Sequence, residues 1–555
     1  MKRRKKNYVK KLVQTSFAVT MLSSAFISSH AFASNYEVNK KNSNNTSTVK
    51  VQLLGLNDLH GQIDTVTKLM LDGENVLAGS MEYTAAAMKQ RESANPNTLM
   101  VHTGDMIGGS PLISAAFQDE PTVEVMESMG FDVGTLGNHE FDEGIEELRR
   151  MMNGGDHPKG TAGYDGMNFP VVAANAFDTA TGELITKPYV VKKVGGKKVG
   201  FIGVVTQETP NIIVSKGNET LKITDEAEAI NKYTKKLKKK GVEAIVVLAH
   251  NPTTQTGNAD AFDASKIAEN VDDEVDVIFS AHNHVKVNKV VDNKLIVQAY
   301  SYGSAFSDVD LELDPVSGDV VKKQAEIVTV YQKDYTPDAA VSSIIKKYKD
   351  LVEPIKAEVV GNSLTALSNS KAYNGDNRDL PLGNLIADGM KASMNADFAL
   401  MNGGGVRAAL DAGEVTFGEL FSIQPFGNVL NKVTLTGADL ETVLNNQLSS
   451  TGYDFHVAGF NYTYSVDTLT NTAKVVDIIL PDGSKIDKTK EYTVVVNNYM
   501  FGNAKYGIAA LSRGMEVGPE DIQATVDYVK ILPNPFEYKQ EGRIKEVTAA
   551  AAVTQ

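Results

Sequence analysis

The 555-residue sequence contains neither cysteine nor tryptophan. Without cysteine the chain cannot form a disulfide framework, a thiolate zinc site or an iron–sulfur cluster, and it has no cysteine nucleophile. Any bound metal must therefore use His, Asp, Glu, Asn or Gln side chains as ligands. Basic residues are also scarce relative to acidic ones, with 55 Lys+Arg against 69 Asp+Glu. This balance argues against a broad basic face for nucleic acid, but it does not exclude small anionic substrates.

Long hydrophobic runs are lacking too, and residues 1–33 have the layout of a secretory signal peptide. They contain seven basic residues and no acidic one, an apolar core around 17–27, and the small-residue tripeptide Ala31-Phe32-Ala33. A core of about ten residues is too short for a bilayer span, which needs about 20. We therefore expect cleavage after Ala33 and a secreted, extracellular protein without a membrane span. Without the seven basic residues of this leader, 48 Lys+Arg remain against 69 Asp+Glu, which gives the mature chain a net charge of −21.

The length predicts two to four domains at roughly 150 residues per domain. From residue 50 to about 330, short runs of Val, Ile and Leu alternate with helix-like segments, which is typical of an α/β layered domain. Apolar residues at helical spacing over 338–353, closed by Pro354, predict a helical linker. The predicted order is a signal peptide at 1–33, a flexible spacer at 34–49, a first domain at 50–335, the linker at 336–357, a second domain at 358–545 and a tail at 546–555.

Five apolar runs in the first domain each end in residues that can bind metals. Side chains that follow the strands of an open α/β sheet converge at one edge, so we expect these residues to lie close together. Imidazole and carboxylate ligands together suit Zn, Mn, Fe or Co. The runs and their polar residues are Val51–Leu56 with Asp58 and His60, Leu99–His102 with Gly104 and Asp105, Phe131–Leu136 with Gly137, Asn138, His139 and Glu140, Ala244–Ala249 with His250, and Val275–Ala281 with His282 and His284.

The spacing within these motifs also favours convergence. In Asp58-x-His60 and His282-x-His284, alternate residues of an extended backbone point to the same side. A glycine before Asp105, and another before Asn138, permits a tight turn that aims the next side chain inward. The remaining histidines are interpreted differently, with His102 as a core or supporting residue and His157 and His456 as loop residues.

In this order the motifs D-x-H, G-D, G-N-H-E, H and A-H-x-H resemble the signature of calcineurin-like metallophosphoesterases, with Ala281 replacing a glycine. The resemblance covers residues 50–310 and implies a four-layer α/β/β/α domain with two divalent ions, Zn, Mn or similar. It implies one ion on Asp58, His60, Asp105 and His284 and the other on Asp105, Asn138, His250 and His282, so that Asp105 bridges them. It further implies that His139 is a catalytic histidine oriented by Asp142.

The second domain carries motifs that resemble the C-terminal substrate-binding domain of the 5'-nucleotidase family, an α+β unit. They are Leu382-Gly383-Asn384-Leu385, Asn402-Gly403-Gly404-Gly405-Val406-Arg407, Gln424-Pro425-Phe426-Gly427-Asn428 and Asn497-Asn498-Tyr499. The triple glycine lets backbone amides approach a ligand, and the planar fork of Arg407 suits phosphate. The resemblance implies that Asn402 and Arg407 bind substrate and that Phe426 and Tyr499 sandwich the base, which is a sequence-tolerant contact.

Two departures from the family pattern concern substrate specificity. The position of a family arginine is occupied by Asp376, and we expect the nearby Arg378 to bind substrate in its place. The position of the acid that usually holds the ribose is occupied by Lys505. The motif Asn497-Asn498-Tyr499 followed by a lysine also resembles the corresponding motif of the related 2',3'-cyclic-nucleotide 2'-phosphodiesterases.

These motifs predict a 5'-nucleotidase that releases phosphate from nucleoside 5'-monophosphates with a metal-activated water. Alternatives within the family are a 2',3'-cyclic-nucleotide 2'-phosphodiesterase/3'-nucleotidase and a UDP-sugar hydrolase. Alternatives of other classes are a binding protein that uses the fold as a scaffold, and an exported nuclease or protein phosphatase. We expect a small nucleotide as the binding partner, with no nucleic acid and no obligate protein partner.

Overall fold

The computed structural model describes residues 47–547 except 72–73, 214–216, 258–261, 371–374, 468 and 471. The predicted signal peptide, residues 34–46 of the predicted spacer and residues 548–555 of the predicted tail lie outside the described part of the chain. Among the described residues, no helix combines the length and the apolar composition that crossing a bilayer requires.

Two six-stranded sheets form the first domain. The first has the order β17-β16-β1-β4-β5-β6, in which β1, β4, β5 and β6 run parallel. The second has the order β14-β15-β13-β12-β10-β9, with β10, β12, β13 and β15 parallel. The bounds are β1 Val49–Leu56, β4 Thr98–His102, β5 Val133–Thr135, β6 Val171–Val172, β9 Tyr189–Val194, β10 Lys197–Val205, β12 Ala244–His250, β13 Val275–Phe279, β14 Lys286–Val291, β15 Lys294–Ala299, β16 Ala305–Leu313 and β17 Val320–Thr329.

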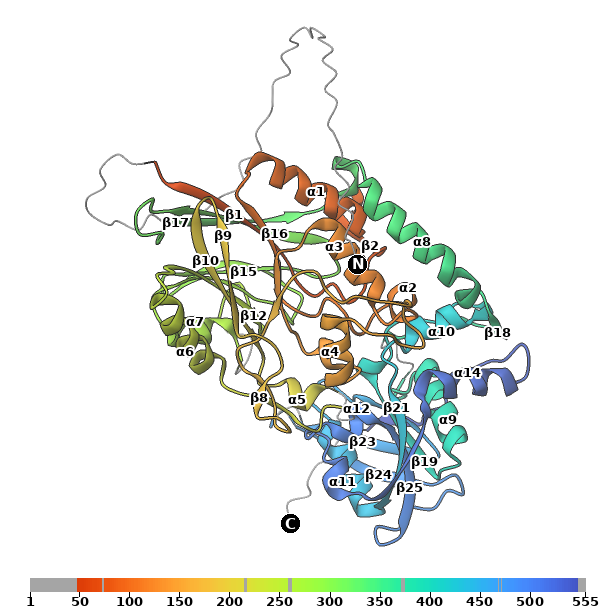
Figure 1. The fold of residues 1–555 in the computed structure, drawn as a ribbon. Coiled ribbons are helices and arrows are strands. Elements are labelled where there is room, and N and C mark those ends of the chain that lie inside the picture. Colours follow the sequence, from red (N-terminus) through yellow and green to blue (C-terminus); the bar gives the residue numbers. More distant parts are fainter. Residues whose placement is uncertain are drawn as a thin grey trace, which may run out of the picture. The chain divides into compact units, whose positions relative to one another are not determined.

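The sheets pack face to face and helices cover their outer faces, which gives the predicted four layers. Val51 and Leu53 of β1 pack with Phe201 of β10 and Phe279 of β13 between the sheets. Leu54 of β1 faces the other way, toward the outer helices, because alternate strand residues point to opposite faces. Helices α1 (Met81–Ala94), α3 (Glu120–Met129) and α8 (Ala339–Lys356) cover the first sheet, and α6 (Glu226–Lys238) and α7 (Ala264–Asn270) cover the second (Figure 1).

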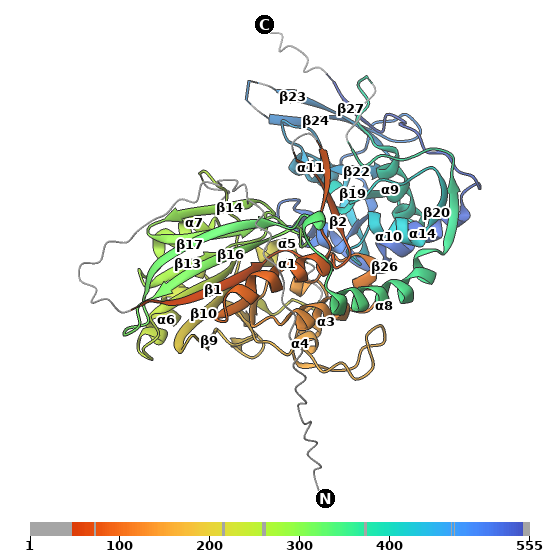
Figure 2. The same ribbon diagram turned by 90° about the horizontal axis from the view of Figure 1, so that it is seen from above.

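Helix α8 occupies the predicted linker and packs on the first domain. Its buried residues Val341, Ile345, Tyr348 and Val352 recur at helical spacing and join the core formed with α1 and α3. Figure 2 shows α8 beside α3. The helix continues to Lys356, so the expectation that Pro354 ends it is wrong. A proline lacks only one hydrogen-bond donor, and here it stands in the last turn of the helix.

Asp276 is a buried carboxylate in β13 that makes the stability of this domain pH-dependent. Its Oδ2 accepts the backbone N–H of Ile245 at 3.0 Å, and Lys323 Nζ lies 3.7 Å from Oδ1. Burial raises the pKa of Asp276 to about 7, although Lys323 opposes the shift. The folded state therefore holds a proton that the unfolded chain releases near pH 4, and the associated stability is lost as the pH rises toward 7.

We expect Asp276→Asn to gain stability relative to the wild type when the pH is raised from 4.5 to 8, because the amide never ionises. Urea unfolding of both proteins at the two pH values measures this change. Asp310→Asn, which alters an exposed carboxylate on β16, is the control. An equal difference between wild type and Asp276→Asn at both pH values would contradict the prediction.

The second domain is built on a mixed five-stranded sheet with the order β22-β19-β25-β21-β26. Helices α9, α10 and α14 share a core on one face, and α11 packs on the other together with the three-stranded sheet β24-β23-β27. The bounds are α9 Pro381–Met394, β19 Phe398–Asn402, α10 Phe417–Ile423, β21 Val429–Thr436, α11 Gly437–Gln447, β22 Phe455–Ala458, β23 Asn461–Asp467, β24 Thr472–Ile479, β25 Glu491–Asn497, α12 Asn498–Gly502, β26 Arg513–Glu520, α14 Asp521–Ile531 and β27 Ile544–Glu546.

Two of the predicted segments end differently in the structure. Strand β1 begins at Val49, inside the predicted spacer, because Val49 pairs with Leu313 of β16. Strand β27 includes Glu546, the first residue of the predicted tail, because Glu546 pairs with Tyr464 of β23. Both residues are therefore part of a sheet.

Candidate active site

Six of the seven predicted metal ligands lie in the loops after β1, β4, β5 and β13, and the seventh, His250, is the last residue of β12. Five of these residues have left-handed backbone conformations, with φ of 50° for Asp58, 49° for His60, 49° for Asp105, 81° for His282 and 57° for His284. Such conformations cost of order 1–3 kcal/mol each for residues other than glycine and concentrate at functional sites. The surrounding fold therefore stabilises backbone geometry that the sequence does not favour locally.

Asp58, His60 and His284 form one group of potential ligands, with atoms within 4.8 Å of one another. His284 Nε2 lies 3.5 Å from Asp58 Oδ1 and 3.3 Å from His60 Nε2. The Asp58 carboxylate also accepts the backbone N–H of His282 at 3.0 Å. The first D-x-H motif and the final H-x-H motif therefore meet, as the sequence predicts.

Asp105, His250 and His282 form a second group of potential ligands, which Asn138 joins. His250 Nε2 lies 3.1 Å from both Asp105 Oδ2 and Asn138 Oδ1. Asp105 Oδ2 is also 3.7 Å from His60 Nε2. Asp105 thus lies between the two groups and is 1% exposed.

Two of the histidines are held in a single tautomer by backbone carbonyls. His60 Nδ1 lies 2.9 Å from the carbonyl oxygen of Gly108, and His250 Nδ1 lies 2.8 Å from that of Thr103. A carbonyl can only accept, so each Nδ1 donates a proton and each Nε2 faces the other potential ligands, His284 in the case of His60 and Asp105 in the case of His250. This is the arrangement that orients metal-binding imidazoles in known sites.

The electrostatics of the site favour cations. Burial lowers the pKa of His60 and His282 to about 4, so both imidazoles are neutral near pH 7. Burial would raise the pKa of Asp105, but His250, His139 and His60 hold it well below the usual range. Burial would likewise lower the pKa of His250, but Asp105 raises it to about 9. The buried carboxylates therefore create a negative potential that either a proton or a metal ion can neutralise.

His139 and Asp142 pair directly beside these ligands. His139 Nδ1 lies 2.8 Å from Asp142 Oδ2, and the backbone N–H of His139 donates to Asp105 Oδ1 at 2.9 Å. Burial would lower the pKa of His139, but Asp142 and Asp105 raise it to about 10. The His139 imidazole is thus protonated and oriented by Asp142 at the edge of the site.

Glu140 is a supporting residue to which the sequence analysis assigned no role. Its buried carboxylate accepts the backbone N–H groups of Asp105, Met106 and Gly137 at 2.8, 2.9 and 2.6 Å. It therefore joins the loop after β4 to the loop after β5. The only sequence feature that pointed to Glu140 was its place in the motif Gly-Asn-His-Glu.

Gly137 of the same motif does not have a left-handed backbone. A glycine is required there because a Cβ atom would lie 2.2 Å from Asp105 Oδ1.

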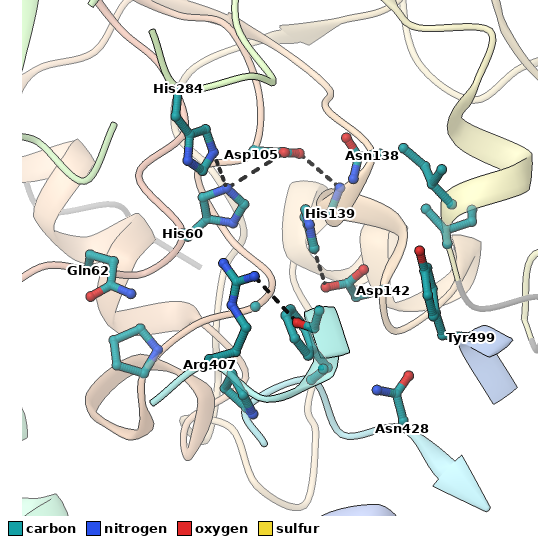
Figure 3. Close-up of a pocket in the computed structure, with 18 of the residues that line it drawn as sticks. His60, Gln62, Asp105, Asn138, His139, Asp142, His284, Arg407, Asn428 and Tyr499 are labelled. Atoms are coloured by element: carbon teal, nitrogen blue, oxygen red, sulfur yellow. Dashed lines mark hydrogen bonds and ion pairs between the residues drawn. The ribbon is translucent and has the colours of Figure 1, made fainter. Parts of the chain in front are cut away.

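A cavity of about 730 Å³ joins the predicted metal ligands to the second domain. From the first domain it is lined by His60, Asp105, Asn138 and His139, and from the second by Asn402, Arg407, Phe426 and Tyr499. The Phe426 ring stacks at 6.2 Å on the imidazole of His139, and the Arg407 guanidinium lies 5.7 Å from the same phenyl ring. Figure 3 shows Arg407 and Tyr499 facing the space beside His60 and His139.

Arg378 and Lys505 are not among the described residues that line this cavity. Arg378 Nε forms an ion pair with Glu546 at 3.0 Å, and its Nη1 donates to the carbonyl oxygen of Gly375, so the guanidinium is engaged beside β27. Its role in substrate binding stays a prediction.

Two histidines that were not predicted to bind metal lie in regular structure. His102 is buried against Phe131 and Phe169, as expected for a core histidine. The prediction that His456 is a loop residue is wrong, because His456 lies in β22.

The fold and this site together define a class of protein, the metal-dependent phosphoesterases. The donors are nitrogen and oxygen atoms only, and Asp105 connects the two groups because it belongs to the second and also forms a cluster with His60 of the first and with His139. This donor set suits divalent Zn or Mn. The residues present therefore fit a pair of divalent ions.

Comparison with known proteins agrees with this class. Residues 51–286 match the family model "Calcineurin-like phosphoesterase", and residues 359–512 match "5'-nucleotidase, C-terminal domain". The chain is 50% identical over 509 residues to "Endonuclease YhcR" of Bacillus subtilis (strain 168), covering 90% of this chain and 41% of that protein. It is 34% identical to "Cell wall protein Lmo0130" of Listeria monocytogenes, covering 91% and 71%. The crystal structure of a 5'-nucleotidase precursor from Thermus thermophilus superposes with a TM-score of 0.71 at 25% identity, covering 90% and 99%.

The chain belongs to the 5'-nucleotidase family, with a calcineurin-like phosphoesterase domain followed by the family's C-terminal domain. It spans less than half the length of the Bacillus subtilis endonuclease that it matches.

Proposed function

We propose that the protein is a 5'-nucleotidase, which hydrolyses nucleoside 5'-monophosphates to nucleosides and phosphate with two divalent metal ions. The observation that carries this proposal is the shared cavity. It is lined by His139 and by members of both ligand groups from the first domain, and by Arg407, Phe426 and Tyr499 from the second. A nucleotide offers a phosphate to the first set and a planar base to the aromatic residues of the second.

The metal ligands divide between two positions that share Asp105. Asp58, His60 and His284 would hold one ion, and Asn138, His250 and His282 the other, in agreement with the two groups of close donor atoms. When bound, such an ion pair polarises a phosphoryl group and activates a water at neutral pH.

The chain's own residues supply the remaining chemistry. His139 keeps a proton on the imidazole because Asp142 pairs with Nδ1. Its other nitrogen is then available to stabilise charge on the phosphoryl group or to protonate the leaving oxygen. Arg407 lines the same cavity from the second domain and would bind the phosphate with its planar, positively charged guanidinium.

A second candidate function is cleavage of phosphodiester bonds in nucleic acid, which the 50% identity to an endonuclease favours. Hydrolysis of AMP, 2',3'-cyclic AMP, UDP-glucose and a long oligonucleotide, each with added Mn²⁺ or Zn²⁺, separates the candidates when the products are identified by chromatography, because only AMP releases inorganic phosphate in a single step. We expect AMP to be the best substrate. Rapid cleavage of the oligonucleotide with no action on AMP would overturn the proposal in favour of a nuclease.

The base clamp is tested by removing one aromatic ring. We expect Tyr499→Ala to raise the KM for AMP roughly tenfold, because a base–aromatic stack contributes about 1–3 kcal/mol. Steady-state kinetics on ribose 5-phosphate, which has no base, should show no change. Tyr499→Phe keeps the ring and serves as the matched control. Equal losses on AMP and ribose 5-phosphate would mean that Tyr499 supports the cavity and does not bind the base.

Export belongs to the same proposal. The leader at 1–33 supports secretion with cleavage after Ala33, and the mature chain would act on nucleotides outside the cell without an obligate protein partner. N-terminal sequencing of the protein from the culture medium should begin at Ser34. Recovery of the uncleaved chain from the cytoplasm alone would refute secretion.

A further inference from the structure

We infer that Asp119 is a positioning residue for the metal centre and that it acts on His60 through Gly108. This inference rests on the proposed metal chemistry. Asp119 Oδ2 accepts the backbone N–H of Gly108 at 3.0 Å, and the carbonyl oxygen of Gly108 accepts the proton of His60 Nδ1 at 2.9 Å. The backbone of Gly108 therefore links Asp119, which holds its N–H, to a predicted metal ligand, which its carbonyl oxygen holds.

Gly108 has little freedom between these partners. Its φ is +83°, and a Cβ atom on it would lie 2.4 Å from the carbonyl oxygen of His139 and 2.7 Å from Asp142 Oδ2. Gly108 therefore contacts His60 on one side and packs closely against the His139–Asp142 pair on the other. A displacement of Gly108 would change the orientation of the His60 ring and the packing of that pair together.

The conformation of Asp119 is not explained by the helix that follows it. Aspartate is among the best N-cap residues, and Asp119 stands at the N-cap of α3, yet its side chain makes no capping hydrogen bond. Asp119 and Gln118 both have left-handed backbones, with φ of 58° and 55°. Two such residues in sequence are unfavourable, and the carboxylate they direct away from the helix reaches Gly108.

Asp119 acts from outside the ligand set. It belongs to neither group of potential metal ligands, and it lines a separate cavity of about 100 Å³ that also borders His139 and Asp142. Groups that hydrogen-bond directly to a metal ligand typically change metal affinity by 10–100-fold when they are removed. Asp119 holds such a group, Gly108, in place, and we expect its removal to have an effect of the same order. The expected effect of Asp119 is therefore on metal binding and turnover, with little effect on substrate affinity.

The test compares Asp119→Ala with Asp119→Asn, which keeps an oxygen acceptor for the Gly108 N–H. Titration calorimetry of the metal-stripped proteins with Mn²⁺ should show affinity weakened roughly 10–100-fold in Asp119→Ala and nearly restored in Asp119→Asn. At saturating Mn²⁺, kcat for AMP should fall in Asp119→Ala with KM unchanged. The matched control is Asp338→Ala, which removes an aspartate that does cap its own helix, α8. It should lower the melting temperature without changing Mn²⁺ affinity.

The inference is overturned if Asp119→Ala binds Mn²⁺ as the wild type does and loses only thermal stability in EDTA, as the control does. It is overturned together with the proposed function if the wild type binds no Mn²⁺. If the wild type binds Mn²⁺ and hydrolyses no nucleotide, the proposed function fails, and the affinity difference still decides the role of Asp119.

Discussion

Replacing His139 with alanine is expected to lower nucleotide turnover by about 10²–10⁴-fold while the protein retains its metal content. The imidazole is held as a proton donor by Asp142 at 2.8 Å, and it borders the cavity. One of its nitrogens also lies within 4.8 Å of ligand atoms of His60 and Asp105, so retained metal content is the result that distinguishes a catalytic role from a ligand role. Its removal takes away a proton and a positive charge at the reacting phosphate. The two groups of ligands that would hold the ions remain intact.

The measurement pairs steady-state kinetics on AMP with elemental analysis of the purified protein. His157→Ala is a suitable control because His157 lies on a loop and contacts Gln118, not the site. We expect Asp142→Asn to give an intermediate loss, since the amide still positions the ring but carries no charge. If His139→Ala loses metal in proportion to its activity, His139 is a ligand and the assigned role is wrong.

The convergence of the predicted metal ligands was accessible from the sequence because it follows from strand topology, whereas their division into two sets came from the resemblance to calcineurin-like metallophosphoesterases. Each apolar run ends in a ligand-type residue, and parallel strands bring their carboxyl ends to one edge. The core could also be predicted from the apolar runs. In β1, for example, Val51 and Leu53 point to the face between the sheets and Leu54 points to the outer helices, because successive residues of a strand point to opposite faces.

Contacts made by the backbone were not accessible from the sequence. Glu140 binds three N–H groups and Asp119 binds one, and no residue pattern distinguishes such carboxylates from solvated ones. The ion pair of Arg378 with Glu546 was hidden for another reason. It depends on β27 pairing with β23, which joins residues more than 80 positions apart.

Asp105 is the residue whose replacement tests the two-ion arrangement most directly. Its carboxylate lies 3.1 Å from His250 Nε2 and 3.7 Å from His60 Nε2, so it approaches an imidazole nitrogen of each ligand group. The surrounding histidines keep the pKa of Asp105 well below its usual range despite burial, which favours the charged carboxylate.

We expect Asp105→Asn to bind fewer ions than the wild type and to lose roughly a thousandfold or more in turnover. The amide has the same shape and can still accept the His139 N–H, but it has no negative charge to share between two cations. Charge stabilisation by such ions amounts to several kcal/mol, and each 1.36 kcal/mol corresponds to a factor of ten in rate. Elemental analysis and AMP kinetics give the two readouts.

Asp308→Asn is the matched control, because Asp308 is a buried carboxylate of β16 that pairs with Gln52 and Arg91 away from the cavity. It should keep the wild-type metal content. If Asp105→Asn keeps both ions and remains within tenfold of wild-type turnover, Asp105 does not bridge them. Loss of one ion with loss of turnover would instead mean that catalysis needs the pair, because a single ion on the remaining ligands would still attract the phosphate.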